Sequence, residues 1–445
     1  MTKTSITYKR IWLVAYPIIL GSIAQNLINF TDTAFLGRVG EIALGAGALG
    51  GLFYLAVIML GLGFGTGAQI IIARRYGEGK LKEVGPVIDH TTLFLAVLAI
   101  FSFWLLRYGS VFILEHIVKS ESIYKGAIDF LEYRSFGIFF AFMNITFRAF
   151  YVGLTKTKVI TYTTIVLATV NIVLDYLLIF GHFGFPEMGI QGAALASVIA
   201  EAFALLFFIV YTFVSIRFAD YALFRFLNVS YSKMLAILRV AVPMMMQSFI
   251  SLSVWFVFFI FIEKLGETSL AISNIIRSFF VILMVPIWGF ATATNTLVSY
   301  LIGKQKEEEV MSLILKIVTL CFFGVLAIVG FGLAFPRLIL EVYTNDQNLI
   351  AMGVPILHVV SGGALLLSIG FIFFNGVSGT GKTNVSLAIE IAVLSIYLTY
   401  TYTIIQVFHV NVTVVWTAEL IYGSLLALFS FVYLKTNWWR ENKLA

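Results

Sequence analysis

Acidic side chains inside long apolar stretches are the residues of this sequence best suited to chemistry. Asp32 lies in QNLINFTDTAFLG, and Asp175 lies in TVNIVLDYLLIFG with Asn171 four residues before it. That spacing places Asn171 and Asp175 on one face of a helix, one turn apart. Ionisable groups in such surroundings are costly and mark ion pathways. We therefore predict a cation site for H⁺ or Na⁺ at Asp32, Asp175 and Asn171, which is a metal site only if the ion is sodium.

Glu201 is a third acid in an apolar stretch, and it follows the small-residue segment GIQGAALASVIA. Small residues let membrane helices approach closely. Ser197 places a hydroxyl one turn before Glu201 on the same helix face. Ser197 and Glu201 are therefore further candidate cation-coupling residues. Two other acids within apolar stretches, Glu390 and Glu419, are expected to have structural or cavity-lining roles.

A different chemistry is suggested by the segment NGVSGTGKTN, in which Gly376 precedes Gly381-Lys382-Thr383 at the spacing of a phosphate-binding loop. Such a loop joins a buried strand to a helix. The residues before this segment, ALLLSIGFIFFN, are instead typical of a membrane helix. We expect a tight turn between two helices, and a membrane-bound nucleotide-hydrolysing enzyme using residues 376–383 is the less favoured alternative.

The composition indicates which elements must position these residues. The chain has 445 residues, of which 60% are hydrophobic and 12% are charged. This charged fraction is about half that of soluble proteins. The single cysteine, Cys321, excludes a disulfide framework, and five scattered histidines disfavour a metal cluster. The composition therefore predicts an all-α polytopic membrane protein.

Twelve apolar stretches are long enough to cross a bilayer, which takes about 20 residues each. With these spans, 20 Lys and Arg residues fall on the face that carries the N-terminus and six on the other. Because basic residues concentrate in cytoplasmic loops, both termini are predicted to be cytoplasmic. The first apolar stretch is too long for a signal-peptide core, so we expect it to be retained. The positive net charge of +6 is thus topological, and a nucleic-acid partner is not expected.

The two halves of the chain repeat each other at one constant offset, which carries Pro17 to Pro243. Between Ala15 and Val84 the alignment needs no gap and contains 16 identical positions. Because each half holds six spans, we expect two parallel repeats. The predicted organisation is an N-terminal lobe at 1–216, a cytoplasmic linker at 217–233 and a C-terminal lobe at 234–445.

Comparison of repeat partners helps to distinguish residues needed for the fold from residues needed for ion coupling. The phosphate-loop segment matches GLTKTKV in the first half, which lacks the glycine before the lysine. Asp32, Asp175 and Glu201 match Phe258, Thr401 and Ala427. A scaffold requirement would tend to appear in both halves, whereas one ion site suffices for coupling. This asymmetry favours a coupling role for the acids of the first half.

The chain resembles the multidrug and toxic compound extrusion (MATE) transporter family along nearly its whole length. The resemblance depends on YPIILGSIAQNLINFTDTAFLGRVGEIALGAGAL, on GFGTGAQIIIARRYGEGK with its echo GFATATNTLVSYLIGKQ, and on NIVLDYLLIFG and GIQGAALAS. It implies a V-shaped, two-lobed antiporter that exports organic, often cationic, drug-like molecules in exchange for inward H⁺ or Na⁺.

The branch resembling DNA-damage-inducible protein F implies residue roles. Its first-lobe cation site matches Asp32, Asn171, Asp175 and Ser197, and its bending proline matches Pro17. Other branches carry a glutamate eight residues after the proline of the seventh span, where this chain has Ser251. A cation site of that second type is therefore in doubt.

We expect a monomer in the plasma membrane, which is the inner membrane if the source is bacterial. We expect no enzymatic activity and no cofactor beyond the coupling ion. One rival within the superfamily is a flippase for lipid-linked oligosaccharides or lipids. It needs basic groups deep in a cavity, and only Arg134, Arg148 and Arg277 lie within or near spans. A channel is a third alternative, which fits the two repeats and the one-sided acid site less well than alternating access.

Overall fold

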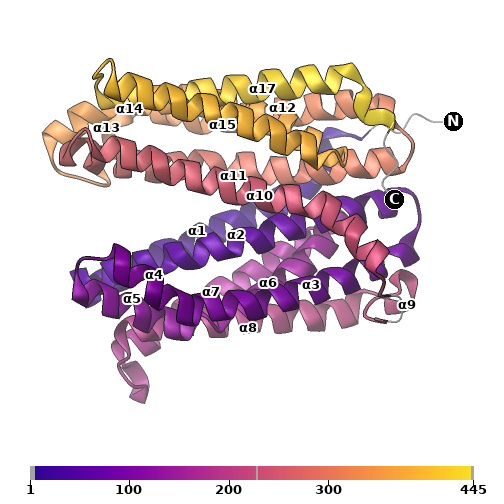
Figure 1. Ribbon diagram of the computed structural model, residues 1–445, viewed down its shortest axis with the longest axis horizontal. Coiled ribbons are helices and arrows are strands. Elements are labelled where there is room, and N and C mark those ends of the chain that lie inside the picture. The colour runs from indigo at the N-terminus through magenta and orange to yellow at the C-terminus, as the bar shows by residue number, and fades with distance from the viewer. Residues whose placement is uncertain (1–5, 227–228, 442–445) are drawn as a thin grey trace. The chain divides into compact units, whose positions relative to one another are not determined.

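The computed structural model describes residues 6–226 and 229–441, and the regular elements in this part of the chain are helical (Figure 1). The main helices of the first half are α1 (Tyr8–Val39), α2 (Glu41–Gly77), α3 (Val84–Trp104), α4 (Ser110–Ile117), α5 (Glu121–Arg134), α6 (Gly137–Gly153), α7 (Lys158–Phe180), α8 (Gly189–Ser215) and α9 (Phe218–Tyr221). Those of the second half are α10 (Tyr231–Glu263), α11 (Glu267–Gly303), α12 (Val310–Ala334), α13 (Pro336–Glu341), α14 (Gln347–Gly379), α15 (Thr383–Gln406), α16 (Val412–Val415) and α17 (Ala418–Thr436).

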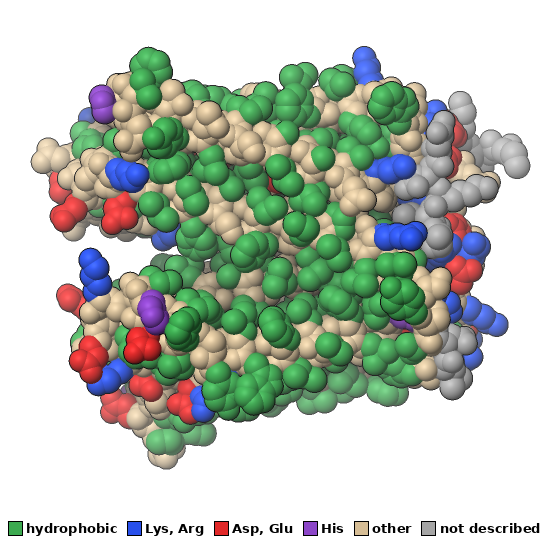
Figure 2. Space-filling view, viewed as in Figure 1, with side chains coloured by type: hydrophobic (Ala, Val, Ile, Leu, Met, Phe, Trp, Pro, Cys, Tyr) green, Lys and Arg blue, Asp and Glu red, His purple; other side chains and the backbone are tan. Residues whose placement is uncertain are grey.

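Within the described residues, eleven helical segments are long and apolar enough to cross a membrane. The bent pair α5 and α6, which turns by 53°, supplies a twelfth if it is counted as one span. Hydrophobic side chains cover the flanks of the helices in Figure 2, and the charged side chains gather at the helix ends. The predicted all-α membrane fold with duplicated halves is confirmed.

The sequence repeat is visible in the backbone. Helix α2 begins at residue 41 and ends at residue 77, and α11 begins and ends at the repeat positions of these residues, 267 and 303. The turns repeat as well, because positive φ angles occur at pairs of residues with the offset that carries Pro17 to Pro243. The pairs are Gly40 and Gly266 (φ 144° and 101°), Gly79 and Gln305 (74° and 55°), Thr155 and Gly381 (57° and 88°), and Phe183 and His409 (56° and 47°).

The fourth span breaks this symmetry. In the first half the span is divided into α5 and α6 at Ser135 and Phe136, whereas α14 in the second half continues unbroken. The residue that ends α5 is Arg134, and its repeat partner is Val360. The span is therefore broken next to the charged Arg134 and continues through the apolar Val360.

Two compact units divide the chain, and each boundary lies just after a proline. One unit is formed by Leu20–Met245, and the other by residues up to Ile19 together with Met246–Ala445. Ile19 follows Pro17 of α1 by two residues, and its repeat partner Met245 follows Pro243 of α10 by two. The lobes predicted from the sequence repeat, 1–216 and 234–445, stay a prediction, since the repeat and the packing divide the chain by different criteria.

Glycines permit close contact where the first parts of α1 and α10 pack within their compact units. An added Cβ at Gly289 of α11 would clash with Ile19 Cγ1, and one at Gly63 of α2 would lie 2.5 Å from Met245 Cα. The two contacts are repeats of each other, because Gly289 is the repeat partner of Gly63 and Met245 is that of Ile19. Glycine thus permits helix contact at both sites.

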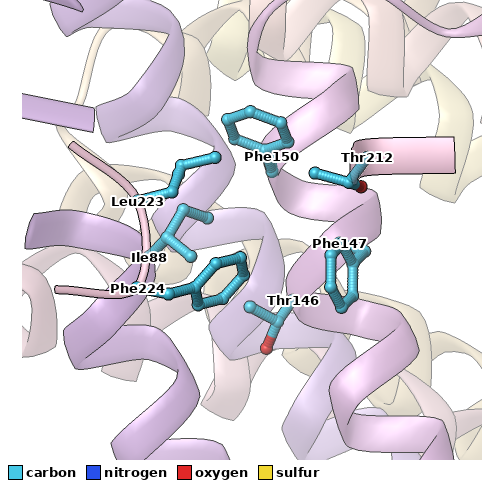
Figure 3. Close-up of a pocket in the computed structure, with 7 residues that line it drawn as sticks. All are labelled: Ile88, Thr146, Phe147, Phe150, Thr212, Leu223 and Phe224. Atoms are coloured by element: carbon cyan, nitrogen blue, oxygen red, sulfur yellow. The ribbon is translucent and has the colours of Figure 1, made fainter. Parts of the chain in front are cut away.

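The predicted linker, residues 217–233, includes residues 227 and 228, which lie outside the described part of the chain. Its described residues pack within the unit formed by Leu20–Met245, where the Phe226 N–H donates to Asp89 Oδ2 of α3 at 2.9 Å. The side chains around the segment after α9 come from α3, α6 and α8 (Figure 3); the whole group is Ile88, Thr146, Phe147, Phe150, Thr212, Leu223 and Phe224. The space between them does not admit a water molecule, so it is a packing gap.

Candidate cation site

Close packing of α7 against α8 positions the candidate residues. A Cβ at Gly192 would lie 2.6 Å from the Leu178 carbonyl oxygen, and Ala193, Ala194 and Ala196 are buried beside it. Small side chains permit this approach. As a result, the Asn171 Nδ2 group of α7 donates to Ser197 Oγ of α8 at 3.5 Å.

Carboxylate and amide oxygens with no donor are concentrated at this contact. Asp175 is fully buried and Asn171 is 1% exposed. Among the described residues, no N–H or O–H group donates to either carboxylate oxygen of Asp175, to Asn171 Oδ1 or to Asp32 Oδ1. Buried polar atoms almost always have partners. Four orphaned acceptor oxygens therefore indicate a site suited to a proton or a cation.

Asp32 of α1 faces Asp175 of α7. Their carboxyl groups lie within hydrogen-bonding reach of each other. Since an ionised carboxylate can only accept hydrogen bonds, the two groups can form such a bond only when one of them carries a proton. The geometry therefore fits two acids that share one proton, a pattern in which the titration belongs to the pair.

An apolar cluster lies one helical turn beyond this pair. Leu36 follows Asp32 by four residues, Ile179 follows Asp175 by four, and Ala193 precedes Ser197 by four. These three buried residues form one core cluster, against which Phe35, Ala43, Leu44, Phe180 and Ile190 pack. The polar site is thus closed off on the side where α1 ends and α8 begins.

An ion pair next to the site holds Glu201. The Arg134 guanidinium donates two hydrogen bonds to its carboxylate, at 2.9 Å and 2.5 Å, and lies over the Tyr54 ring with 3.7 Å to the centroid. Tyr54 Oη donates to the same carboxylate at 3.3 Å. The Arg134 charge also acts on Asp32. Arg134 therefore connects the two acidic groups electrostatically.

The helix break between α5 and α6 makes room for this ion pair. Gly137 is the first residue of α6, and a Cβ there would clash with Arg134 Nη1 and lie 2.5 Å from Glu201 Oε2. Asn144, two turns further along α6, donates from Nδ2 to the Glu201 carbonyl at 2.9 Å. Neither Tyr54 nor Gly137 was predicted, because their roles depend on residues that are distant in the sequence.

The structure brings together Asp32, Asn171, Asp175 and Ser197, the core of the predicted site. Glu201 is close in sequence to Ser197, but its carboxylate is bound by Arg134 and Tyr54. Pro17 is buried inside α1, at the boundary of the compact units and far along the helix from Asp32. No group of three or more His, Cys, Asp or Glu that could hold a metal ion occurs in the described part of the chain.

The phosphate-loop segment has a packing role. Helix α14 ends at Gly379 and α15 begins at Thr383, so the segment joins two helices. A Cβ at Gly376 would lie 2.6 Å from Ile314 Cδ1, and one at Gly379 would lie 2.9 Å from the Asn295 carbonyl. Gly381 has φ 88°, which favours glycine. The glycines serve helix contacts and a tight turn.

These features define a class: multi-pass membrane proteins built from two duplicated helical halves, with acids buried between the helices. The model of the MatE family matches residues 17–177 and 243–403, which together make up more than half of the chain. The two matched regions begin and end at residues that are repeat partners of each other. The chain belongs to the MatE family.

Several curated relatives carry the name "Probable multidrug resistance protein NorM". The protein from Thermotoga maritima is 25% identical over 95% of this chain and 92% of its own length. The one from Geobacillus kaustophilus is 26% identical over 78% of this chain and 76% of its own. The match to the Agrobacterium fabrum protein covers 58% of that relative's length.

Solved structures share the fold. One described as an outward-facing conformation of a multidrug resistance MATE family transporter has a TM-score of 0.89 at 21% identity and covers 97% of this chain and 95% of its own. A MOP superfamily transporter from Pyrococcus furiosus has a TM-score of 0.87 at 21% identity, with the same coverage. A MATE structure in the bent conformation has a TM-score of 0.85 at 22% identity and covers 96% of this chain and 95% of its own.

Proposed function

We propose that this protein is a secondary antiporter that exports organic, often cationic, drug-like compounds in exchange for H⁺ or Na⁺ moving inward. The names of the relatives support a role in multidrug resistance. The observation that carries the coupling proposal is the group of four orphaned oxygens on Asp32, Asn171 and Asp175. A proton or cation that binds there during the cycle would supply the partner that these oxygens lack.

Charge neutralisation is the proposed coupling step. With both carboxylates ionised, Asp32 and Asp175 repel each other at short range in a medium of low dielectric constant. A proton shared between them, or a sodium ion held also by Asn171 and Ser197, removes this repulsion. Helix α1 can then pack more closely on α7 and α8.

We propose Pro17 as the hinge that this repacking uses. Proline lacks an N–H donor and its ring clashes with the preceding turn, so helices bend there. The part of α1 after the boundary at Ile19 belongs to the unit that contains the acid pair. Movement of this part changes the volume available to the exported compound, and a ligand that binds the two states unequally shifts the equilibrium between them.

Transport in proteoliposomes tests the proposal. Ethidium efflux is measured under a pH gradient alone and under a sodium gradient alone, for the wild type, Asp32→Asn and Asp175→Asn. We expect one gradient to drive efflux in the wild type and neither to drive it in the variants. Glu115→Gln, which changes an exposed acid of α4, is the matched control. Gradient-driven efflux at the wild-type rate in Asp32→Asn would contradict the role given to this residue.

The flippase alternative requires free basic groups to bind a pyrophosphate. Arg134 is engaged by Glu201, and Arg277 lies 5.4 Å from the Phe259 ring centroid. The donors of Arg134 are thus occupied, which favours the antiporter at this one of the three candidate arginines. Transfer of a fluorescent lipid-linked phosphate between leaflets, unaffected by Asp32→Asn, would favour the flippase instead.

A further inference from the structure

The unit formed by residues up to Ile19 and Met246–Ala445 contains two buried acids of its own. Glu390 of α15 is 1% exposed, and Glu419 of α17 is 3% exposed. Neither is part of the Asp32–Asp175 site, because both belong to the other compact unit. The sequence predicts a structural or cavity-lining role for both acids. In the structure, hydroxyl groups donate hydrogen bonds to each of them.

The two helices hold these acids reciprocally. Tyr422 of α17 donates from Oη to Glu390 Oε1 of α15 at 2.9 Å. Tyr397 of α15 donates from Oη to Glu419 Oε1 of α17 at 2.9 Å. The tyrosine rings are in edge contact, with 5.8 Å between centroids. The four side chains therefore form one continuous cluster, in which Tyr422 is half-buried and the other three are buried.

Helix α10 adds a third donor and connects the cluster to a divided helix. Ser251 Oγ lies 2.6 Å from Glu390 Oε1 and donates to it. Ser251 is eight residues after Pro243, in the helix that the unit boundary divides after Met245. A rearrangement of α10 therefore changes the number of donors that reach Glu390.

The second oxygen of Glu390 has no partner, and no basic group offsets either carboxyl. Glu390 Oε2 receives no hydrogen bond in the described part of the chain. The ion pairs of the described residues include neither Glu390 nor Glu419. The titratable groups that face Glu390 are Tyr422 and, through the tyrosine pair, Tyr397 and Glu419; α10 contributes Ser251, and α14 contributes the Phe371 ring against Tyr422.

This arrangement suits a proton and little else. An isolated buried carboxylate is costly when no countercharge is present. A neutral carboxylic acid avoids that cost, and its remaining oxygen can hold the proton. Both carboxyl groups are enclosed, because Glu390 and Glu419 are at most 3% exposed, whereas the donors Ser251 and Tyr422 are half-buried. A proton is small enough to enter and leave through a chain of hydroxyl groups.

The location in the repeat supports a role in transport. The repeat offset places Tyr397 at the position of Asn171, and Thr401 at the position of Asp175. In the first half the acid site lies on α7 against α8. In the second half the cluster lies on α15 against α17, the corresponding fifth and sixth spans.

We propose that Glu390, with Glu419 as its partner, is a second proton-binding site, and that it takes a proton from water and returns it to water during each transport cycle. The proton binds at the free Oε2 of Glu390. It leaves to water while the hydroxyl donors of α10 and α17 reach Glu390 and stabilise the carboxylate, and it binds again when a rearrangement of these helices withdraws a donor. The proposal uses the antiport cycle proposed above, but the site can be measured without transport.

Infrared spectroscopy of the purified protein in nanodiscs tests the site directly. Protonated carboxylic acids give a carbonyl-stretch band that carboxylates lack. We expect the wild type to show this band over an acid-to-alkaline titration and on addition of ethidium. The part of this band that belongs to Glu390 should be missing in Glu390→Gln. It should be present in the double variant Asp32→Asn and Asp175→Asn. Glu341→Gln, an exposed acid of α13, is the control.

A positioning variant guards against loss of folding in Glu390→Gln. Tyr422→Phe keeps the Glu390 carboxyl and removes only the phenol hydroxyl that donates to it. The carbonyl band assigned to Glu390 should move to higher frequency because it has lost a hydrogen bond, whereas the band of the Asp32–Asp175 pair should not move. Superimposable spectra of wild type, Glu390→Gln and Tyr422→Phe at every pH would overturn the proposal, as would a Glu390 band that ignores both pH and ethidium.

Transport measurements separate failure of this inference from failure of the proposed function. Glu390→Gln should retain ethidium binding but flatten the dependence of export on pH and lower the number of protons moved per ethidium. If Asp32→Asn abolishes coupling and Glu390→Gln changes neither quantity, only the second site is wrong. If Asp32→Asn retains coupling while Glu390→Gln alters it, the coupling role of the first site is wrong and the second stands.

Discussion

At the residue scale, the protein treats its buried charges in two ways. Glu201 is fully engaged by Arg134 and Tyr54, so this carboxylate is balanced where it lies. Asp32 and Asp175 form no ion pair within the described residues, and the side chain that faces each of them is the other acid. A balanced charge is typical of structure, and an unbalanced pair is typical of a site that changes occupancy.

Gly137 provides a test of the balanced pair. Gly137→Ala would place a methyl group against Arg134 Nη1 and 2.5 Å from Glu201 Oε2, so the ion pair must separate. Breaking a fully buried ion pair costs about 3–5 kcal/mol, and this pair is partly buried, so a smaller loss is expected. We expect a lower melting temperature of the purified protein, measured by thermal unfolding in detergent. Gly324→Ala on α12, where an added Cβ meets nothing within 4 Å, is the matched control and should not destabilise. An unchanged melting temperature in Gly137→Ala would show that the pair contributes little.

At the element scale, the proposed hinge of α1 is Pro17, which lies inside the helix. Pro17→Ala restores a donor and removes a ring clash, which makes a helix interior more stable by about 3 kcal/mol in soluble hosts. We expect ethidium binding to remain while the rate of gradient-driven export falls, because the straight form of α1 is favoured. Export is followed by ethidium fluorescence in proteoliposomes.

Pro243→Ala makes the corresponding change in α10 at the repeat position and serves as the comparison. If α1 alone bends during the cycle, only Pro17→Ala slows export. Export at the wild-type rate in both variants would show that neither proline is a hinge.

Much of the arrangement of the helices was predictable from the sequence. Apolar length located the spans, and the repeat of Pro17 at Pro243 fixed the offset that helices α2 and α11 follow. The break of the fourth span was not predictable, since the ion pair beside it joins Arg134 to Glu201 across 67 residues of sequence. The division of α1 and α10 between the compact units could not be read from the sequence, because helix periodicity contains no information about which neighbour a helix packs on.

The site was predictable to the extent that it is local. The four-residue spacing of Asn171 and Asp175 and the isolation of Asp32 among apolar residues identified the first-half acids. The partners of Glu201 could not be identified in the same way, because Tyr54 is an ordinary aromatic residue of an apolar span. Glu390 and Glu419 were recognised as acids within spans, but their reciprocal tyrosines are apparent only when α15 lies against α17.

At the scale of the whole molecule, the predicted orientation has both termini in the cytoplasm. Cys321 is the single cysteine of the sequence and is fully buried, so it should react slowly with polar maleimides. We expect Lys80→Cys, after α2, to be labelled only from the cytoplasmic side of cells or oriented vesicles. Lys119→Cys, after α4, should be labelled only from the opposite side. Labelling of both from one side would show that the loops are misassigned.

Each compact unit borrows the first part of a helix from the other half of the chain, residues up to Ile19 in one case and Tyr231–Met245 in the other. A gene cut in the segment between α9 and α10 would therefore yield two polypeptides that are each missing a piece of their own bundle and each carrying a piece of the other's. Like domain-swapped partners, the fragments would be obligate companions. Each fragment is therefore expected to fold poorly when it is expressed without the other.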